Sequence, residues 1–569
     1  MIVLFELYKY DKALLERILP REYISYLNNP NEATTEYVGY CHFGANSEAK
    51  DYVLILPKIF VDESGLAFGK YKPEIFSTSN FYNSKYEIDR AIVRFINEMS
   101  CWIYKSLLIY QKRNENESDL IGLKTVNLPQ VVSRNNSNSS HSLLDIYLAF
   151  VEFSKKNSNL FISIIKNSNK GSCIKWEKTV TKTTPIMVKG TPIYRDLKTK
   201  QRAVSHEDEL LSLYYSVLYY FKTYYNFDIR LTLNYKIIKG NKFTSLLDGK
   251  GIRLLKKIKN RYFSDTFKKL WNLLYLFFDY ESKCKATNNL NEVLVTKYYP
   301  AVFEDMIDSL LGDNIKDSVI PAYYKDQKDG RIVDHIYSYK DLLNDSNIYY
   351  IGDSKYYQQG HNVVGTSLDK QFTYAKNVIQ YNIDEENRYE NRFRSVRYRD
   401  DLTEGYNITP NFFISAFLNS NLDLLPDLHA VDQPITHYHF KDRLFDRDTL
   451  TVQRYNINFL FVLVTYISKD EFFKNKFKDE SRRKFRKEII SFTNNSYYFF
   501  KVYANTNISL EMFVERNFKK LNGKMYYNSN CKNFIIVALS KKCYQSLGDA
   551  QNFIFSLSLA KGSEMFELM

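Results

Sequence analysis

The amino-acid sequence predicts an α/β protein of the α+β kind, with a mixed sheet. Segments whose apolar residues recur at helical spacing are interleaved with short apolar runs typical of strands. Hydrophobic residues make up 44% of the chain and charged residues 25%, a balance typical of a globular protein. With 569 residues the chain exceeds the roughly 100–200 residues of one domain, so we expect two or three domains.

Residues 1–132 are expected to form an α+β domain that is a candidate for binding a partner or DNA. The run at 52–61 (YVLILPKIFV) suits a buried strand, and 87–112 has the apolar spacing of a helix. The polar stretch at 133–142 (SRNNSNSSHS) has the composition of a linker. We therefore place a domain boundary in this stretch.

Residues 143–285 are predicted to be mainly helical. Two segments with helical spacing support this, 142–156 and 208–225. The segment 170–180 (KGSCIKWEKTV) is predicted as a glycine turn followed by a strand that contains Trp176. The segment 249–263 is basic and amphipathic, which suits an ordinary solvated helix face better than a helix that contacts phosphate or a partner.

Residues 286–569 are expected to hold a second sheet and a C-terminal extension. The predicted elements, in order, are a helix over 287–313, strands at 330–339 and 347–357, a helix over 367–383 and a strand at 410–419. Turn residues between the two consecutive strands favour a hairpin. The order helix, strand, strand, helix, strand predicts a compact α/β unit.

Charged residues interrupt the two strands of this predicted hairpin. Asp353 and Lys355 share one strand face, and Asp334 lies in the strand before them. Pairing of the strands brings these three side chains to one point. Glu304 lies upstream, on the predicted helix. His335 is expected to point to the opposite face of its strand, into the core.

Charge at this position indicates a site for a cation. Carboxylates are the ligands of a hard divalent ion, and Mg²⁺ fits best, with Mn²⁺ as a substitute. A lysine beside them can offset charge on a phosphate. An Asp-x-Lys pair alone is usually a surface salt bridge, and Asp305 and Asp308 compete with Glu304 for its role. The apolar strand, the preceding aspartate and the helical glutamate together favour a site.

Asp334, followed by Asp353-Ser354-Lys355, resembles the signature of the PD-(D/E)xK nuclease superfamily. Val333 stands where that signature has its proline. The resemblance implies a restriction-endonuclease-like core within 286–569. It also implies that Asp334 and Asp353 bind the metal and that Lys355 orients or activates the attacking water, which cleaves the phosphodiester without a covalent intermediate.

Two further residues are similar to positions of the same superfamily. Glu304 matches the acidic residue on the helix before the hairpin, which implies that it holds a second metal or a metal-bound water. Gln371 resembles the glutamine on the next helix, which implies that it positions a ligand or the nucleophile. Tyr374 follows three residues later rather than four, so the QxxxY pattern is not met.

Two other segments resemble restriction subunits of the McrC-like and LlaJI-like kinds. They are 170–180 and 443–463. The resemblance implies a bacterial restriction and antiviral defence system, in which an McrB-like AAA+ GTPase is the partner and residues 1–285 engage it. The sequence has no GxxxxGK[ST] pattern, so nucleotide hydrolysis is expected from that partner.

The formal net charge of +14 favours an anionic partner, for which we expect double-stranded DNA. Compositional bias toward lysine is a competing explanation. Basic clusters at 391–399 and 481–487 suit either a DNA backbone or a solvated face. The apolar run at 458–467 is shorter than the about 20 residues that cross a bilayer, and the six cysteines form no CxxC pair. We expect a cytoplasmic protein outside the membrane, with monomer and oligomer both open.

Two other functions stay open. One is a non-catalytic DNA-binding subunit that activates a partner NTPase. The other is an RNA-cleaving, toxin-like nuclease. The sequence does not give a recognition site or a dependence on base modification, because base readout depends on groove geometry.

Overall fold

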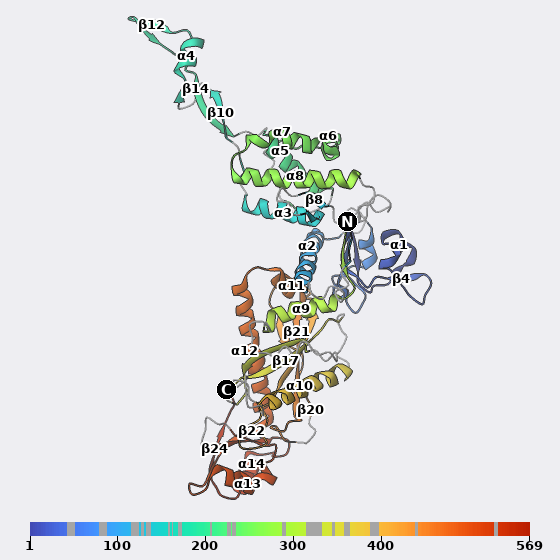
Figure 1. Cartoon of the computed structure of the whole chain (residues 1–569), viewed down its shortest axis with the longest axis vertical. Helices are drawn as coiled ribbons and strands as arrows, with labels where there is room; N and C mark the ends of the chain where they lie inside the picture. Colours follow the sequence, from blue (N-terminus) through green and yellow to red (C-terminus); the bar gives the residue numbers. More distant parts are fainter. Residues whose placement is uncertain are drawn as a thin grey trace.

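The computed structural model describes most of the chain and has the mixed α/β fold that the sequence predicts (Figure 1). The described residues are 1–42, 52–78, 88–114, 124–126, 130–132, 138–140, 142–157, 160–161, 163–168, 173–204, 208–224, 229, 231, 235–286, 292–313, 333–343, 347–357, 365–386, 398–437, 442–527 and 533–569. Parts of several predicted segments lie outside them, namely 133–137, 170–172, 287–291, 330–332 and 391–397.

The N-terminal region is built on a five-stranded sheet. Its order is β1 (Ile2–Phe5), β6 (Tyr52–Leu56), β5 (Val38–His42), β15 (Glu292–Thr296) and β7 (Lys124–Val126). Strands β1 and β6 are parallel, and the other pairs are antiparallel. Helix α2 (Arg90–Arg113), predicted over 87–112, packs against β5 and β15. Beside this sheet lie α1 (Lys12–Ile18) and the small sheet of β2 (Tyr10–Asp11), β4 (Glu32–Thr34) and β3 (Ser25–Tyr26).

Strand β15 corrects the prediction of one helix over 287–313. Residues 292–296 (EVLVT) form a strand, and the helix of this segment, α9, spans Tyr299–Leu311. The β-branched residues of 292–296 suit a strand that is paired on both sides, here with β5 and β7. A side chain at Gly39 of β5, where φ is +142°, would collide with the Leu294 carbonyl oxygen, so this pairing needs glycine.

The middle region combines a helical layer with a projecting arm (Figure 1). The layer contains α3 (Leu143–Lys156), α5 (Glu209–Thr223), α6 (Asn241–Ser245), α7 (Gly251–Ile258) and α8 (Asp265–Ala286). The arm contains β10 (Ser163–Ser168), β11 (Cys173–Ile174), α4 (Trp176–Lys182), β12 (Ile186–Val188), β13 (Thr191–Ile193) and β14 (Thr199–Val204). A short hairpin, β8 (Gln130–Val132) with β9 (Asn138–Ser140), precedes α3.

The strand predicted around Trp176 is wrong, because Trp176 begins helix α4. Pairing of β11 with β14 ends at Ile174. The Thr179 hydroxyl then accepts a hydrogen bond from the Lys198 backbone N–H (3.0 Å), which fixes the following turn as helix against the returning chain. This contact spans residues far apart in the sequence, so local propensity does not predict it.

The second large sheet follows the predicted order of elements. Helix α9 precedes β16 (His335–Lys340) and β17 (Asn347–Lys355), and α10 (Gly365–Glu386) leads to β18 (Pro410–Phe417). The sheet continues with β21 (Leu450–Asn458), which pairs with β19 (Leu428–Ala430) and β20 (Ile435–His437). Strands β16 and β17 form the predicted antiparallel pair, whereas β17, β18 and β21 run parallel.

Helices α11 (Phe459–Ile467) and α12 (Glu471–Ser496) lead to a C-terminal sheet. Its order is β23 (Met525–Tyr527), β24 (Phe534–Ser540), β22 (Tyr497–Ala504) and β25 (Ala560–Phe566). Helices α13 (Leu510–Leu521) and α14 (Leu547–Phe555) complete a separate hydrophobic core there. The C-terminal sheet and the arm lie at opposite ends of an elongated molecule (Figure 1). Among the described helices, none combines the length and apolar character needed to cross a bilayer.

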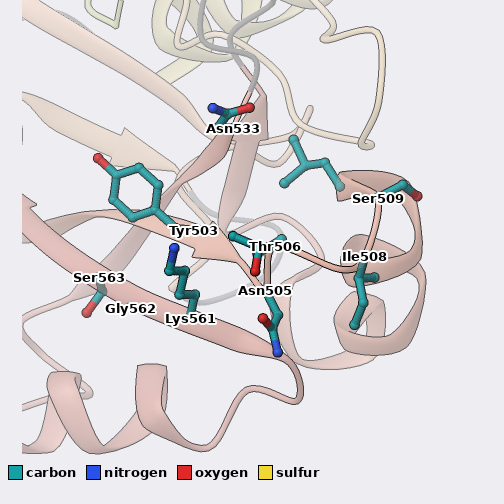
Figure 2. A pocket seen from close by; sticks show the side chains of 11 residues that line it. Tyr503, Asn505, Thr506, Ile508, Ser509, Asn533, Lys561, Gly562 and Ser563 are labelled. Carbon is teal, nitrogen blue, oxygen red and sulfur yellow. The ribbon is translucent and has the colours of Figure 1, made fainter.

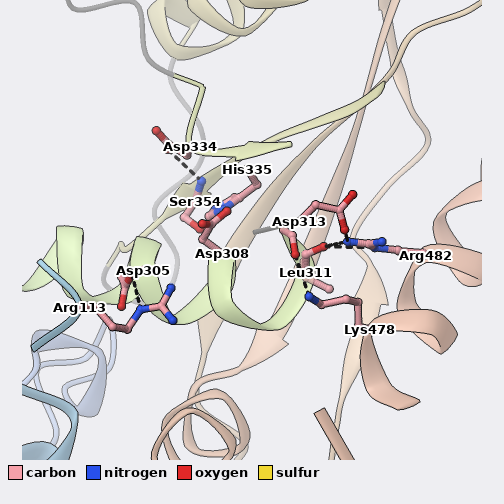
Figure 3. A network of polar contacts seen from close by, with 11 residues as sticks. Arg113, Asp305, Asp308, Leu311, Asp313, Asp334, His335, Ser354, Lys478 and Arg482 are labelled. Atoms are coloured by element: carbon pink, nitrogen blue, oxygen red, sulfur yellow. Dashed lines mark hydrogen bonds and ion pairs between the residues drawn. The ribbon is translucent and has the colours of Figure 1, made fainter. Parts of the chain in front are cut away.

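Three basic residues of α12 donate hydrogen bonds to neighbouring elements of the chain, whereas Arg483 and Lys487 are exposed. Arg482, which is 7% exposed, donates to the Leu311 carbonyl (3.2 and 2.6 Å) and to Asp313 Oδ1 (2.6 Å), at the end of α9 (Figure 3). Lys484 and Arg486 donate to backbone carbonyls as well. The 481–487 cluster is thus largely used inside the chain.

We expect Arg482→Met to lower the free energy of unfolding by about 2–4 kcal/mol, because it leaves buried acceptors at the end of α9 without their donor. Urea unfolding followed by far-ultraviolet circular dichroism measures this. Arg483 is exposed on the same helix, so Arg483→Met is the matched control and should change stability by less than about 0.5 kcal/mol. Equal effects of the two substitutions would contradict the role of Arg482.

Candidate active site

The structure brings Asp334, Asp353 and Lys355 together at one end of the β16–β17 pair. The antiparallel register pairs His335 with Gly352, so Asp334, which precedes β16, lies beside the end of β17. Asp334 Oδ2 accepts a hydrogen bond from the Ser354 backbone N–H (3.4 Å; Figure 3). Lys355 Nζ forms an ion pair with Asp353 Oδ2. The local hairpin register therefore places these side chains as the alternation of the strands predicts.

Glu304 of α9 belongs electrostatically to the same cluster. Burial and the charge of Asp353 raise the pKa of Glu304 to about 7, although Lys355 opposes the shift. Burial also raises the pKa of Asp334 well above its ordinary value, and a side-chain hydrogen bond with Asp353 and the charges of Asp353 and Glu304 add to this shift. Three carboxyl groups thus compete for the neutralising effect of one lysine.

Lys355 keeps its proton in this environment. Burial disfavours its positive charge, but the attraction of Asp353 and their hydrogen bond outweigh burial and raise the pKa of Lys355. Its ammonium group also lies over the ring of Phe413 in β18, with 5.4 Å between Nζ and the ring centroid. Lys355 is therefore a stable cation beside the carboxylates.

The other two acids of α9 are held by different parts of the chain. Asp305 accepts a hydrogen bond from Arg113 Nε (3.1 Å) and another from the Tyr466 hydroxyl. Asp308 Oδ1 lies 3.5 Å from His335 Nδ1. The charge of Asp353 is among the causes of the raised pKa of Glu304, whereas the charges that act on the pKa of Asp305 are those of Arg113 and Asp308.

His335 lies in the core behind the cluster, as expected. Its side chain is fully buried, and Nε2 lies 2.6 Å from Ser354 Oγ. Ser354 therefore contacts Asp334 through its backbone N–H and His335 through its hydroxyl (Figure 3). Sequence reasoning missed Ser354, although strand alternation already places it on the face of β17 opposite Asp353 and Lys355.

Gln371 of α10 is buried but is engaged elsewhere. Its Nε2 donates to Asn411 Oδ1 (2.6 Å), and Asn411 Nδ2 donates back to the Gln371 carbonyl (3.1 Å). Asn411 pairs with Ile351 of β17, two residues before Asp353. Among the described contacts, none joins Gln371 directly to the four other predicted site residues. The sequence analysis did not identify Asn411 either. A polar residue within the otherwise apolar run 410–419 is visible in the sequence, and the structure buries it.

The donor set fits a hard cation in its chemistry. Glu304, Asp334 and Asp353 supply the carboxylate oxygens that Mg²⁺ and Mn²⁺ prefer. Within the part of the chain that the structure describes, no group of three or more His, Cys, Asp or Glu residues is arranged to hold a metal ion. Asp353 forms an ion pair with Lys355 and a side-chain hydrogen bond with Asp334, so these carboxylates must turn toward a cation in order to bind it.

A separate pocket of about 680 Å³ opens in the C-terminal sheet region (Figure 2). Its lining is mostly polar and includes Tyr503, Asn505, Thr506, Ser509 and Lys561. None of the predicted site residues lines it. We therefore place the candidate chemistry at the β16–β17 end and not in this pocket.

Comparison with known proteins identifies no family for this chain. No protein-family model and no curated protein sequence matches it. One similar solved structure is the refined half-complex from a tetradecameric assembly of Thermococcus gammatolerans McrB AAA+ hexamers with bound McrC. The identity is 11%, the TM-score is 0.25, and the match covers 85% of this chain and 99% of that chain. A similarity this weak establishes neither a shared fold nor a shared function.

We expect Glu304→Gln to stabilise the protein at pH 8.5 in EDTA, by on the order of 2 kcal/mol. The raised pKa of Glu304, about 7, favours the folded state below the ordinary glutamate pKa, and this contribution is lost as the pH rises through 7. The difference from wild type should therefore nearly disappear at pH 4, below the ordinary glutamate pKa. Thermal unfolding at both pH values measures it. The exposed Glu511 provides the control Glu511→Gln, which should show no such pH dependence. A stability difference that is the same at both pH values would contradict the burial of charge at Glu304.

Proposed function

We propose that this chain is a metal-dependent endonuclease that hydrolyses phosphodiester bonds of DNA in a bacterial restriction and antiviral defence system, with Mg²⁺ as the ion and Mn²⁺ as a substitute. The observation that carries the proposal is the convergence of Asp334, Asp353 and Lys355 at one end of the β16–β17 pair, with Glu304 from α9. The PD-(D/E)xK resemblance of the same residues supports it.

In this proposal Asp334 and Asp353 would hold the cation, and Glu304 would hold a second cation or a water beside it. The cation would offset charge on the phosphate and lower the pKa of water. Lys355 retains its proton and donates hydrogen bonds from Nζ to the phosphate or to the attacking water. Gln371 reaches a ligand or the nucleophile by giving up its bond to Asn411. Water attacks phosphorus directly, the P–O bond to the leaving sugar oxygen breaks, and a proton from the water ends on that oxygen as its hydroxyl.

Double-stranded DNA is the proposed substrate because the chain carries a net charge of +14. Much of the basic cluster in α12 is used for contacts within the chain, but Arg483 and Lys487 remain exposed there. They are the residues of that cluster that we propose for contact with the phosphate backbone. A cytoplasmic location follows from this substrate.

We expect Asp353→Ala and Lys355→Ala each to lower the rate of Mg²⁺-dependent plasmid cleavage by roughly 10²–10⁴-fold, because the first removes a proposed ligand of the cation and the second removes the positive charge proposed to act on the phosphate or the attacking water. The rate of supercoiled plasmid loss, with and without EDTA, measures this. The ion pair of Lys376 with Asp448 (2.9 Å) lies in the same region and provides matched controls, Lys376→Ala and Asp448→Ala. Unchanged cleavage by Asp353→Ala and Lys355→Ala would contradict the proposal. Faster cleavage of single-stranded RNA than of plasmid would favour the toxin-like alternative.

A second function, activation of a partner NTPase, is favoured by the arm. Six apolar side chains of α4, β12 and β13 are between 46% and 61% exposed, namely Trp176, Val180, Ile186, Met187, Val188 and Ile193. An exposed apolar cluster of this kind marks a protein interaction site. The arm lies within residues 1–285, the part for which the McrC-like resemblance implies contact with a motor. We propose an McrB-like AAA+ GTPase as the partner.

We expect Met187→Asp to reduce the stimulation of GTP hydrolysis by an McrB-like AAA+ protein at least about 10-fold, because a charge at the arm opposes apolar docking. Phosphate release, measured while this chain is titrated into the partner, tests this. Phe555 is 74% exposed in the C-terminal region, so Phe555→Asp is the control. Stimulation that is unchanged by Met187→Asp, or that is reduced equally by both substitutions, would contradict the role of the arm.

A further inference from the structure

The N-terminal strand reaches the residue that follows Lys355. Tyr356 donates a hydrogen bond from its hydroxyl to Glu6 Oε2 (2.7 Å), at the end of β1. The same oxygen accepts a hydrogen bond from the Lys58 backbone N–H (3.0 Å). Glu6 and Tyr356 are each 5% exposed. A contact between side chains 350 residues apart thus lies beside the proposed catalytic lysine.

The ring of Tyr356 also touches the helix that carries Glu304. It lies 5.5 Å from the Tyr299 ring and 6.0 Å from the Phe303 ring, between centroids. Lys58 Nζ lies 4.8 Å from the centroid of the Tyr356 ring, on the N-terminal side. Displacement of this ring would therefore disturb the end of β17 and the first turns of α9 together, and these two elements hold the cluster.

The backbone beside Glu6 is fixed in an unfavourable conformation. Leu7 has φ +60°, in the left-handed region that residues other than glycine seldom adopt. Two backbone hydrogen bonds hold this turn, from Glu6 N to the Leu56 carbonyl and from Leu7 N to the Thr35 carbonyl, each 2.8 Å. The Leu7 side chain is 48% exposed, so its packing does not account for the conformation. The turn ends β1 with the Glu6 carboxylate buried against Tyr356.

A second polar contact joins the N-terminal region to α9. Arg113, the last residue of α2, donates to Asp305, which follows Glu304 (Figure 3). The N-terminal region thus contacts the neighbour of Lys355 and the neighbour of Glu304. Of the two contacts, that of Glu6 is the better placed to position the site, because both of its partners are buried, whereas the Arg113 side chain is 46% exposed.

We infer that Glu6 and Tyr356 form a positioning bridge through which the N-terminal region holds Lys355 in its working position. The bridge sets the cleavage rate without touching DNA or metal. This inference rests on the proposed nuclease function. It implies that whatever displaces the N-terminal sheet changes the turnover of the site rather than its affinity for DNA.

The test uses substitutions that break or keep the bridge in the full-length chain. Tyr356→Phe removes only the hydroxyl and keeps the ring on Tyr299 and Phe303, and Glu6→Leu removes the acceptor. We expect each to lower kcat for plasmid cleavage by about 10- to 100-fold, since small misplacements have effects of this size, with KM for DNA unchanged. The double variant should be no slower than the slower single variant, because both break one interaction.

Two control substitutions show whether the hydrogen bond between Glu6 and Tyr356 is what sets kcat. Glu6→Gln retains an oxygen that can accept both hydrogen bonds, so its kcat should stay within about twofold of wild type. Tyr8→Phe removes a hydrogen bond of the same kind and length, from Tyr8 to Glu74 (2.7 Å), that does not reach β17, and it should leave kcat unchanged. Melting temperatures are recorded for all variants. If Tyr356→Phe does not fold, the comparison of Glu6→Leu with Glu6→Gln carries the test.

A readout that does not depend on cleavage separates this inference from the proposed function. Lys355 is 17% exposed, and its acetylation by an amine-reactive ester can be followed by mass spectrometry. We expect acetylation at Lys355 to become severalfold faster in Tyr356→Phe and Glu6→Leu but not in the two controls. Unchanged acetylation and unchanged kcat in the bridge variants would overturn the inference. A wild-type protein that does not cleave, or a fully active Asp353→Ala, would overturn the proposed function while the acetylation result still decides on the bridge.

Discussion

Helix α9 is the element on which the site and its surroundings depend. Three of its acidic side chains face three different parts of the chain: Glu304 interacts electrostatically with Asp353 and Lys355, Asp305 accepts hydrogen bonds from Arg113 and Tyr466, and Asp308 lies 3.5 Å from His335. Its apolar face packs on β16, β17, α11 and α12. Because the helix is rigid, a shift that satisfies one of these contacts would disturb the other two.

The same packing concentrates negative charge where it is poorly solvated. Glu304, Asp334 and Asp353 face one lysine, so the group would carry three negative charges and one positive charge, a net −2, if all three carboxyls were ionised. Burial makes that state unfavourable, and the raised pKa values of Glu304 and Asp334 are the response. Either protons or a cation must supply the missing positive charge. A divalent ion would supply it once these carboxylates turn toward the ion, which is the physical argument behind the proposal of a metal-dependent reaction.

The parts of the site that the sequence predicts are those fixed by local geometry. Strand alternation and the hairpin register suffice to bring Asp334 to Asp353 and Lys355, and helical spacing suffices for α10. The parts that it does not predict depend on distant partners. The pairing of residues 292–296 with β5 and β7 joins residues far apart in the sequence, and so does the contact of Thr179, in the helix that Trp176 begins, with the returning chain at Lys198. The contact of Glu6 with Tyr356 leaves no local pattern in the sequence.

These long-range pairings also join the N-terminal region to the site through the backbone. Strand β15 is part of the N-terminal sheet and ends at Thr296, and α9 begins at Tyr299. Two residues therefore separate a strand of one region from the helix that carries Glu304. The hydrophobic core is continuous across the same place, where the Phe60 ring lies 5.8 Å from the Phe459 ring. A displacement of the N-terminal sheet would therefore also displace α9 and β17, because the backbone, the hydrophobic core and the contact of Glu6 with Tyr356 connect them.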